Sequence, residues 1–294
     1  MAAQKIVKTA ARTAAGLGAA LLAAAGVAAL AVPAIRHYVV ARLNDPAGLP
    51  ALASDSRVRF EQGAKACAEA VAALLPGAVA RIEAAQGRPF AAAPIVAVFS
   101  SYETYGRANS FGTPFVAGVS WSGRVTLSPA LCGDERVRLP GVLTHELSHS
   151  HFFGWRSEFL KRPPSWFTEG LAVFASDGGG AEGVSDARAV DAIRDGYAIV
   201  VDDDTLWPSF AGIAFAREPP RDPASADPVT PRQRLAYRQA SMFVAFLSQG
   251  DPQAFAAFLD ALYAGERFEP AFEKAFRAPV ATAWARFVQT ASEK

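Results

Sequence analysis

The sequence predicts an α+β fold, in which a small mixed sheet is followed by a mostly helical C-terminal part. Two observations lead to this class. The segments that we expect to form strands all lie in the first half of the chain, and apolar residues recur at spacings of three and four through most of the second half. The 294 residues are 51% hydrophobic and 19% charged, which is typical of a globular protein. A net charge of +1 with scattered cations argues against nucleic acid as a partner.

Residues 1–43 form a separate N-terminal segment that we expect to enter a membrane. Residues 14–35 contain no charged side chain, and a stretch of this length can span a bilayer. We favour an uncleaved anchor. The alternatives are a signal peptide cleaved after Ala29-Leu30-Ala31 and a buried Ala-rich helix. The leader before the apolar run contains three cations and no acidic residue: Lys5, Lys8 and Arg12.

Both membrane interpretations place the rest of the chain outside the cytoplasm, because a positive leader tends to stay inside. We therefore expect one domain, residues 44–294, on the periplasmic side of the cell membrane, or secreted to the periplasm if the leader is cleaved. In that compartment Cys67 and Cys132 can form a disulfide, worth about 4 kcal/mol in the chain-entropy model. The alternative is two small buried thiols.

The first elements of this domain are predicted from periodicity and from Gly and Pro. Residues 44–55 are rich in Pro, Ala and Gly and indicate a linker. Apolar spacing predicts a helix over 58–75, ended by Pro76-Gly77, and a short helix over 79–85. The β-branched residues 95–100 indicate a buried strand.

The remaining elements form a hairpin and a series of helices. Residues 115–121 and 124–127 predict two strands joined at Ser122-Gly123. The Pro- and Asp-rich residues 219–231 indicate an exposed loop. Helices are predicted over residues 140–153, 165–176, 187–194, 232–248, 252–264 and 270–290.

A cluster of histidines lies in one predicted helix, in the segment His145-Glu146-Leu147-Ser148-His149-Ser150-His151. His145 and His149 are one turn apart on one face, so both imidazoles can bind the same metal ion. Glu146 lies beside that face, where its carboxylate can take a proton from a metal-activated water. His151 points to the opposite side, and we expect it to be a packing or supporting residue.

A catalytic zinc site of this type needs a third protein ligand. The extended metzincin pattern is absent, because Phe152 and Trp155 stand where it requires Gly and His. Downstream lies the segment Trp166-Phe167-Thr168-Glu169-Gly170-Leu171-Ala172. Together with the HExxH motif, this segment resembles the gluzincin or peptidase MA-like zinc metallopeptidases, in which the glutamate of the second motif is the third ligand. The resemblance covers residues 115–176 and extends loosely to the C-terminal helices.

The resemblance implies a Zn²⁺ site formed by His145, His149 and Glu169, with Glu146 as the general base in peptide-bond hydrolysis. The competing third ligand is Glu158. The alternative role of Glu169 is a carboxylate that favours the positive end of its helix. The aspartate that usually follows the glutamate ligand in thermolysin-like members is replaced here by Val173, so the sequence does not identify what orients the first histidine.

Two further features follow from the resemblance. Tyr237, in a Tyr-x-Gln-x-Ser segment, would donate a hydrogen bond to the oxyanion of the transition state. The strand over 115–121 would be an edge strand beside the pair of zinc-binding helices and would hold an extended substrate. The alternatives are a partly buried Tyr237 with a hydrated hydroxyl, and an ordinary core strand.

The function predicted from these motifs is a zinc metallopeptidase that acts on a peptide or protein substrate and contacts the membrane through its N-terminal helix. The first alternative is a catalytically inactive, peptidase-like protein that binds metal or peptide; the intact Glu146 argues against it. The second is an anchored scaffold in which the histidines only buffer metal, and the segment around Glu169 argues against that. The absence of a Gly-x-Met-Glu-Asn motif favours endopeptidase action.

Overall fold

In the computed structural model, four short strands form one mixed sheet in the order β1-β2-β4-β3. The strands β1 (Val58–Phe60), β2 (Ile95–Val98) and β4 (Arg124–Leu127) are parallel neighbours. The strand β3 (Gly118–Trp121) pairs with β4 in antiparallel register and lies at one edge of the sheet. The structure describes Gly26 and residues 31–121, 123–157, 160–201, 215–217, 219–220 and 229–293.

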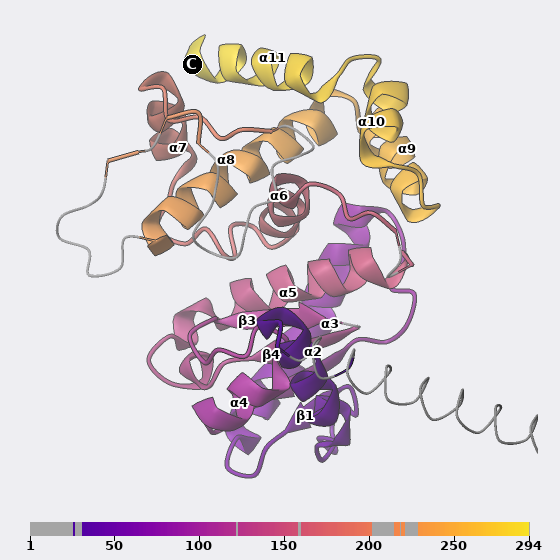
Figure 1. The fold of residues 1–294 in the computed structure, drawn as a ribbon, viewed down its shortest axis with the longest axis vertical. Coiled ribbons are helices and arrows are strands. Elements are labelled where there is room, and N and C mark those ends of the chain that lie inside the picture. The colour runs from indigo at the N-terminus through magenta and orange to yellow at the C-terminus, as the bar shows by residue number, and fades with distance from the viewer. Residues whose placement is uncertain are drawn as a thin grey trace, which may run out of the picture.

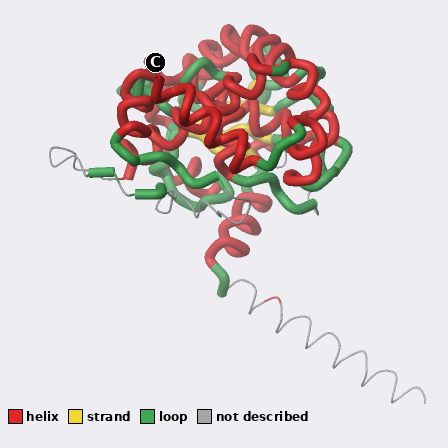
Figure 2. Tube along the Cα trace, turned by 90° about the horizontal axis from the view of Figure 1, so that it is seen from above, coloured by secondary structure: helices red, strands yellow, loops and turns green. Residues whose placement is uncertain are grey.

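Helices cover both faces of the sheet, and Figure 2 shows the strands enclosed among them. The helices α3 (Lys65–Gln86) and α5 (Leu139–Gly154) pack on one face. On the other face lie α4 (Tyr102–Ala108) and, against it, α2 (Pro33–Leu43). Successive side chains of β2 alternate between the two apolar cores, as the strand period requires. We call the elements from α2 to α5 the sheet part.

The remaining helices form a second part with its own core, which lies above the sheet part in Figure 1. This helical part consists of α6 (Ser165–Ala175), α7 (Asp186–Arg194), α8 (Val229–Gly250), α9 (Pro252–Tyr263), α10 (Phe268–Phe276) and α11 (Val280–Glu293). Its core is dominated by aromatic rings in edge or tilted contact, an arrangement that such rings favour. The largest fully buried rings in it are Trp166, Phe167, Phe243, Phe258 and Phe272, together with Phe152 of α5.

A buried polar network joins the two parts. The side-chain oxygen of Gln86, at the end of α3, accepts a hydrogen bond from the hydroxyl of Tyr263 on α9 at 2.9 Å. The same oxygen lies 2.8 Å from Nδ1 of His151 on α5, and the Gln86 amide donates to the Ser148 hydroxyl at 2.7 Å. One glutamine side chain therefore contacts three groups on two other helices.

Most predicted elements of the second half are confirmed. The helices α5, α6, α7, α8 and α9 lie where periodicity predicted them, with small shifts of their ends. The strand at 95–100 and the hairpin partner at 124–127 are also confirmed, whereas the strand predicted over 115–121 begins only at Gly118. The predicted loop at 219–231 lies largely outside the described residues, and α8 already begins at Val229.

The predictions for residues 58–85 were right about helix over 65–75 and 79–85, but wrong about residues 58–60 and about a break at Pro76. The segment Val58–Phe60 is the strand β1, and a single helix, α3, continues through Pro76 to Gln86. Proline inside a helix costs about 3 kcal/mol. The buried stripe Val71, Leu75, Ala78 and Ile82 continues across it, and burying one such large side chain contributes about 1.5–3 kcal/mol. Core burial therefore outweighs the helix-breaking effect of Pro76.

The single helix predicted over 270–290 was also wrong, because α10 and α11 are separate. Arg277 has a left-handed backbone (φ 54°) that caps α10, and Pro279 precedes the start of α11. The helices α2 and α4 were not predicted. Residues 44–55 are not a free linker either: they include the short helix Pro46–Gly48, which packs against β2 and β4.

Two expectations concern the N-terminal segment and the cysteines. Among the described residues, no helix is both long and apolar enough to cross a membrane; most of residues 14–35 lie outside the described part of the chain. Cys67 on α3 and Cys132, just after β4, are bonded as a disulfide, with their Cα atoms 5.4 Å apart. The disulfide alternative is therefore the one that the structure bears out.

Candidate metal centre

The helices α5 and α6 bring together the two histidines of the HExxH motif and Glu169. Nε2 of His145 lies 3.1 Å from Nε2 of His149, and the two nitrogens lie 3.2 Å and 3.4 Å from Oε2 of Glu169. All three ligand atoms lie within 4.8 Å of one another. His145 and His149 share one face of α5 because they are a helical turn apart, and Glu169 projects from the first turns of α6.

Two imidazoles and one carboxylate form a donor set that suits a transition-metal ion. Two nitrogens and one carboxylate oxygen converge on one point, and the His145 ring is buried. Such a set is found in catalytic zinc sites, where three protein ligands leave a further position open. Imidazole and carboxylate also bind other transition metals, so the donor set defines a metal site without defining the element.

The orientation of His145 is fixed by a backbone carbonyl. Nδ1 of His145 donates to the carbonyl oxygen of Gly179 at 2.9 Å. Because a carbonyl can only accept, Nδ1 carries a proton, and in the neutral ring Nε2 is then the nitrogen whose lone pair can bind a metal. The hydroxyl of Ser176 lies 3.3 Å from the same oxygen. Histidine ligands commonly donate their second N–H to a carboxylate or a carbonyl. The Gly179 carbonyl therefore orients the His145 ring, in place of the aspartate that Val173 replaces.

The turn that presents this carbonyl requires its glycines. It follows α6 and contains Gly178 and Gly180, whose φ angles of 101° and 86° favour glycine. A Cβ on Gly179 would lie 2.2 Å from the carbonyl oxygen of Gly141 on α5, and a Cβ on Gly180 would lie 2.9 Å from Nδ1 of His145. The turn can therefore reach His145 only because it has no side chains on that side.

Glu146 is held against the edge strand. The backbone N–H of Ser120 on β3 donates to its carboxylate, and a Cβ on Gly118 would lie 2.7 Å from Cγ of Glu146. Glycine at position 118 thus leaves room for the carboxylate between α5 and β3. Burial raises the pKa of Glu146, and the charge of Glu169 adds to this effect, while the two histidines oppose it.

Tyr237, on α8, lies at the same site. Its ring stacks on that of His145, with centroids 6.0 Å apart and planes 14° apart. Its hydroxyl interacts with Glu169 and accepts a hydrogen bond from the amide of Gln233 at 3.0 Å. Burial, followed by the charge of Glu169, raises the pKa of Tyr237 well above its ordinary value, so the hydroxyl keeps its proton at neutral pH.

The charges of the ligand group are strongly coupled. Burial disfavours a charged His145, but the hydrogen bond and the charge of Glu169 outweigh burial and raise the pKa of His145 to about 9. Burial acts to raise the pKa of Glu169, but the two histidines hold that pKa well below its ordinary range. In the metal-free protein a proton on His145 therefore compensates the carboxylate.

The other residues considered from the sequence lie elsewhere. His151 is fully buried on the far side of α5, with Nε2 2.9 Å from the Arg88 carbonyl oxygen, so it does not belong to the ligand group. Glu158 lies outside the described residues. The supporting roles of Gly179, Gln233 and Ser120 were not predicted. The three consecutive glycines after α6, and the one-turn spacing of Gln233 from Tyr237, are the only sequence signals for them.

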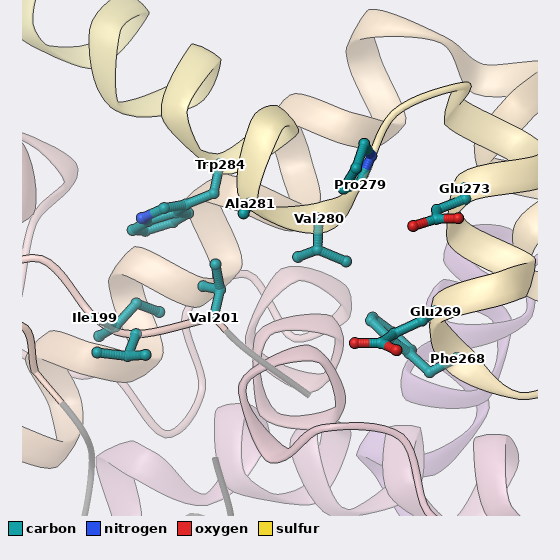
Figure 3. A pocket seen from close by; sticks show the side chains of 10 residues that line it. Ile199, Val201, Phe268, Glu269, Glu273, Pro279, Val280, Ala281 and Trp284 are labelled. Atoms are coloured by element: carbon teal, nitrogen blue, oxygen red, sulfur yellow. The ribbon is translucent and has the colours of Figure 1, made fainter. Parts of the chain in front are cut away.

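A separate cavity lies within the helical part, away from the ligand group. It has a volume of about 410 Å³ and lies between residues 199–201 and the helices α10 and α11. Figure 3 shows its apolar wall, with Trp284 and Val280, and the carboxylates of Glu269 and Glu273 at its side. None of its described lining residues belongs to the candidate metal centre.

Comparison with known proteins adds no relative. No protein-family model matches the chain, and neither a curated protein nor a solved structure matches it. The fold and site define the chain as a mixed α/β protein, mostly helical, with a His-His-Glu group that could hold a metal ion. The likeness to gluzincins stays a prediction from the two sequence motifs.

Proposed function

We propose that this chain is a zinc-dependent metallopeptidase that hydrolyses peptide bonds on the periplasmic side of the cell membrane. One observation carries the proposal: the three ligand atoms of His145, His149 and Glu169 converge, and the carboxylate of Glu146 lies beside them, held to the edge strand. A purely structural ion pair would not need Glu146 there. A zinc ion held by these ligands would supply Lewis acidity toward water and toward a carbonyl oxygen.

Glu146 is the general base in this proposal. A base works best when its pKa approaches the working pH, and burial moves the pKa of Glu146 in that direction. The N–H of Ser120 orients the carboxylate without neutralising it. Glu146 would accept the proton of the attacking water and later deliver it to the leaving amine.

Tyr237 is the proposed hydrogen-bond donor to the oxyanion. The hydroxyl keeps its proton, interacts with the proposed ligand Glu169 and accepts from the amide of Gln233, so these contacts hold the O–H beside the ligand group, where it could turn to an oxyanion. Replacing Tyr237 with Phe should lower kcat by about 10²-fold with little change in KM, because the donor is needed mainly as charge develops on the oxygen. Steady-state kinetics on a fluorogenic peptide, with zinc content measured in parallel, tests this. A kcat equal to wild type would remove Tyr237 from the mechanism.

The proposed substrate is an extended peptide or protein segment. The strand β3 is an edge strand of the sheet, and its residues Gly118 and Ser120 contact Glu146. An exposed strand edge can pair with the main chain of a peptide. A peptide bound in this way would lie next to the proposed base. The lack of an amine-recognition motif favours cleavage within a chain.

The decisive experiment separates ligands from base. Glu146→Gln keeps the shape of the side chain and removes its basicity, so this variant should bind about one zinc per chain, as the wild type does, and lose nearly all hydrolysis. The variants His149→Ala and Glu169→Ala should lose zinc as well as activity. Metal content by mass spectrometry and digestion of a peptide library are the two measurements, and Glu69→Gln, an exposed position on α3, is the matched control.

Each outcome has a distinct meaning. If Glu146→Gln cleaves peptides as fast as wild type, the proposed reaction is wrong. If both proteins hold zinc and neither cleaves any peptide, the chain is an inactive peptidase-like binding protein. If Glu169→Ala holds zinc normally, the third ligand has to be sought at Glu158.

A further inference from the structure

The helix α2 exposes an apolar stripe along its whole length. Ile35, Val39 and Leu43 follow one another at spacings of four, which places them on one face of the helix, and Val32 lies just before its first residue. All four are between 36% and 81% exposed. The opposite face packs on the domain: Ala41 is buried, and the ring of Tyr38 meets that of Trp121 at 6.1 Å. The exposed stripe is therefore not needed to hold α2 in place.

A second exposed apolar residue lies in the segment between α4 and β3. Phe115 is 94% exposed, the most exposed large apolar side chain among the described residues. Its segment is joined to α2, because Pro114 lines a pocket of about 310 Å³ together with His37 and Val40, and a Cβ on Gly112 would meet the His37 ring at 2.5 Å. Phe115 thus belongs to a segment that lies directly beside α2.

The chain itself indicates what covers this surface. The helix α2 begins at the end of the uncharged residues 14–35, whose length suits a bilayer crossing. Val32 has an extended backbone (φ −82°, ψ 116°) and Pro33 begins the helix, so α2 starts as a new helix at this point. The same helix bears Arg36 and Arg42, cations that suit anionic lipid headgroups. Exposed apolar surface with cations beside it is typical of segments that lie in a membrane interface.

We propose that the apolar stripe of α2 and Phe115 form a lipid-docking surface, which rests in the interfacial zone of an anionic bilayer. Phe115 leads into β3, and β3 contacts Glu146, so docking would fix the distance of the candidate metal centre from the membrane. The inference uses the proposed membrane location but not the proposed reaction. Loss of peptidase activity in any test would leave it untouched.

The test uses the full chain reconstituted into vesicles of phosphatidylcholine and phosphatidylglycerol. The native cysteines are bonded to each other, so a single introduced cysteine can be labelled with an environment-sensitive dye. Phe115→Cys is the informative site, because it is far in sequence from the apolar run, and Val39→Cys reports on the stripe. Val137→Cys is the matched control: Val137 is 89% exposed and lies on the short helix Arg136–Arg138, which packs against α5.

We expect the dyes at positions 115 and 39 to lose emission when nitroxide-bearing lipids are included, and the dye at 137 to keep it. Equal, weak quenching at 115 and 137 would overturn the proposal. So would failure of the full chain to float with the vesicles. A dye at 115 whose spectrum changes with protein concentration, without quenching by lipid nitroxides, would show that a second copy of the chain covers the surface instead.

Discussion

His145 uses its two ring nitrogens for different contacts. Nε2 faces His149 and Glu169, and Nδ1 donates to the carbonyl oxygen of Gly179. A supporting contact of this kind holds the ring and its tautomer, and its loss typically lowers metal affinity by about 10- to 100-fold. The geometry thus makes the metal affinity of the site depend on a residue that has no side chain.

Replacing Gly179 with Ala should lower zinc affinity by about 10- to 100-fold, because the new Cβ would clash with the carbonyl oxygen of Gly141 and displace the turn. Competition with a chelating dye measures the affinity. Gly77→Ala is the control, since a Cβ at Gly77 meets no atom within 4 Å. Unchanged affinity in Gly179→Ala, at normal thermal stability, would show that the carbonyl does not support His145.

Zinc binding should also depend on pH in a defined direction. The pKa of His145 is raised to about 9 by Glu169, so below that pH the ring must lose a proton before it can bind metal. We expect zinc affinity to rise about tenfold per pH unit from pH 6 toward pH 9, and then to level off. Calorimetry in buffers of different ionisation enthalpy would count the released proton. Binding that is independent of pH over this range would contradict the assignment.

At this scale the sequence could predict which side chains come together, but not the groups that support them. The HExxH spacing places His145 and His149 on one face of α5 with Glu146 beside them, because helix geometry is local, and the group that could hold a metal ion includes both histidines. The role of Glu146 as a base stays a prediction. The carbonyl of Gly179 and the N–H of Ser120 are backbone groups that every residue has, and only the approach of a distant turn or strand selects them. No residue type in the sequence marks that selection.

At the scale of elements, the short segment before β1 is tied to the sheet by an ion pair. The guanidinium of Arg124 on β4 donates to the carboxylate of Asp45 at 2.6 Å, and Asp45 also accepts from the N–H of Ala47. Burial acts to raise the pKa of Asp45, but these hydrogen bonds and the charge of Arg124 outweigh it and lower that pKa. This segment connects α2 to the sheet and so helps to hold the lipid-docking surface.

Replacing Asp45 with Asn should lower the free energy of unfolding by about 1 kcal/mol at pH 7. A carboxyl with a lowered folded pKa stabilises the fold above its unfolded pKa, near 4, and loses that contribution as the pH falls through the folded value. The difference between variant and wild type should therefore shrink below about pH 4. Urea unfolding at several pH values measures it, with Asp191→Asn, an exposed pair partner on α7, as the control. A difference that stays constant with pH would contradict this origin.

Element prediction succeeded where periodicity and burial agree. The helices α8 and α9 show one apolar face, whereas α5 and α6 are buried on most sides and were placed from the Pro and Gly residues at their ends. The predicted break at Pro76 was wrong because core packing keeps α3 continuous across it. The end of α10 was missed because nothing in the side chain of Arg277 favours a left-handed backbone. The seven-residue helix α4 is too short to show a period.

At the scale of the whole molecule, the two parts meet at the candidate metal centre and at the network around Gln86. The residues that could hold a metal ion come from α5 and α6, and the polar network joins α3, α5 and α9. Arg88 adds an ion pair with Asp260 at 2.6 Å and lies 4.2 Å from the ring of Tyr263. These contacts indicate that both parts unfold together.

Replacing Gln86 with Leu should lower the free energy of unfolding by about 3 kcal/mol or more, because His151, Tyr263 and Ser148 each lose a buried partner. We also expect the single unfolding transition to broaden or split into two, which calorimetry would detect. Gln62→Leu, at an exposed position, is the control. A loss below 1 kcal/mol would mean that the network contributes little to the joining of the two parts.

The order of synthesis gives this network a consequence for the growing chain. α3 and α5 leave the ribosome well before α9, so Gln86 lacks its hydrogen bond from the hydroxyl of Tyr263 until α9 has been made. The ring of Phe152 likewise lacks its contacts with Phe167 and Tyr263, which are both synthesised later. A nascent chain that stops short of α9 therefore carries bare aromatic surface and an incomplete polar core, the state in which chaperones and proteases compete for a protein. Helix α9, in the last third of the chain, therefore completes the packing of α3 and α5.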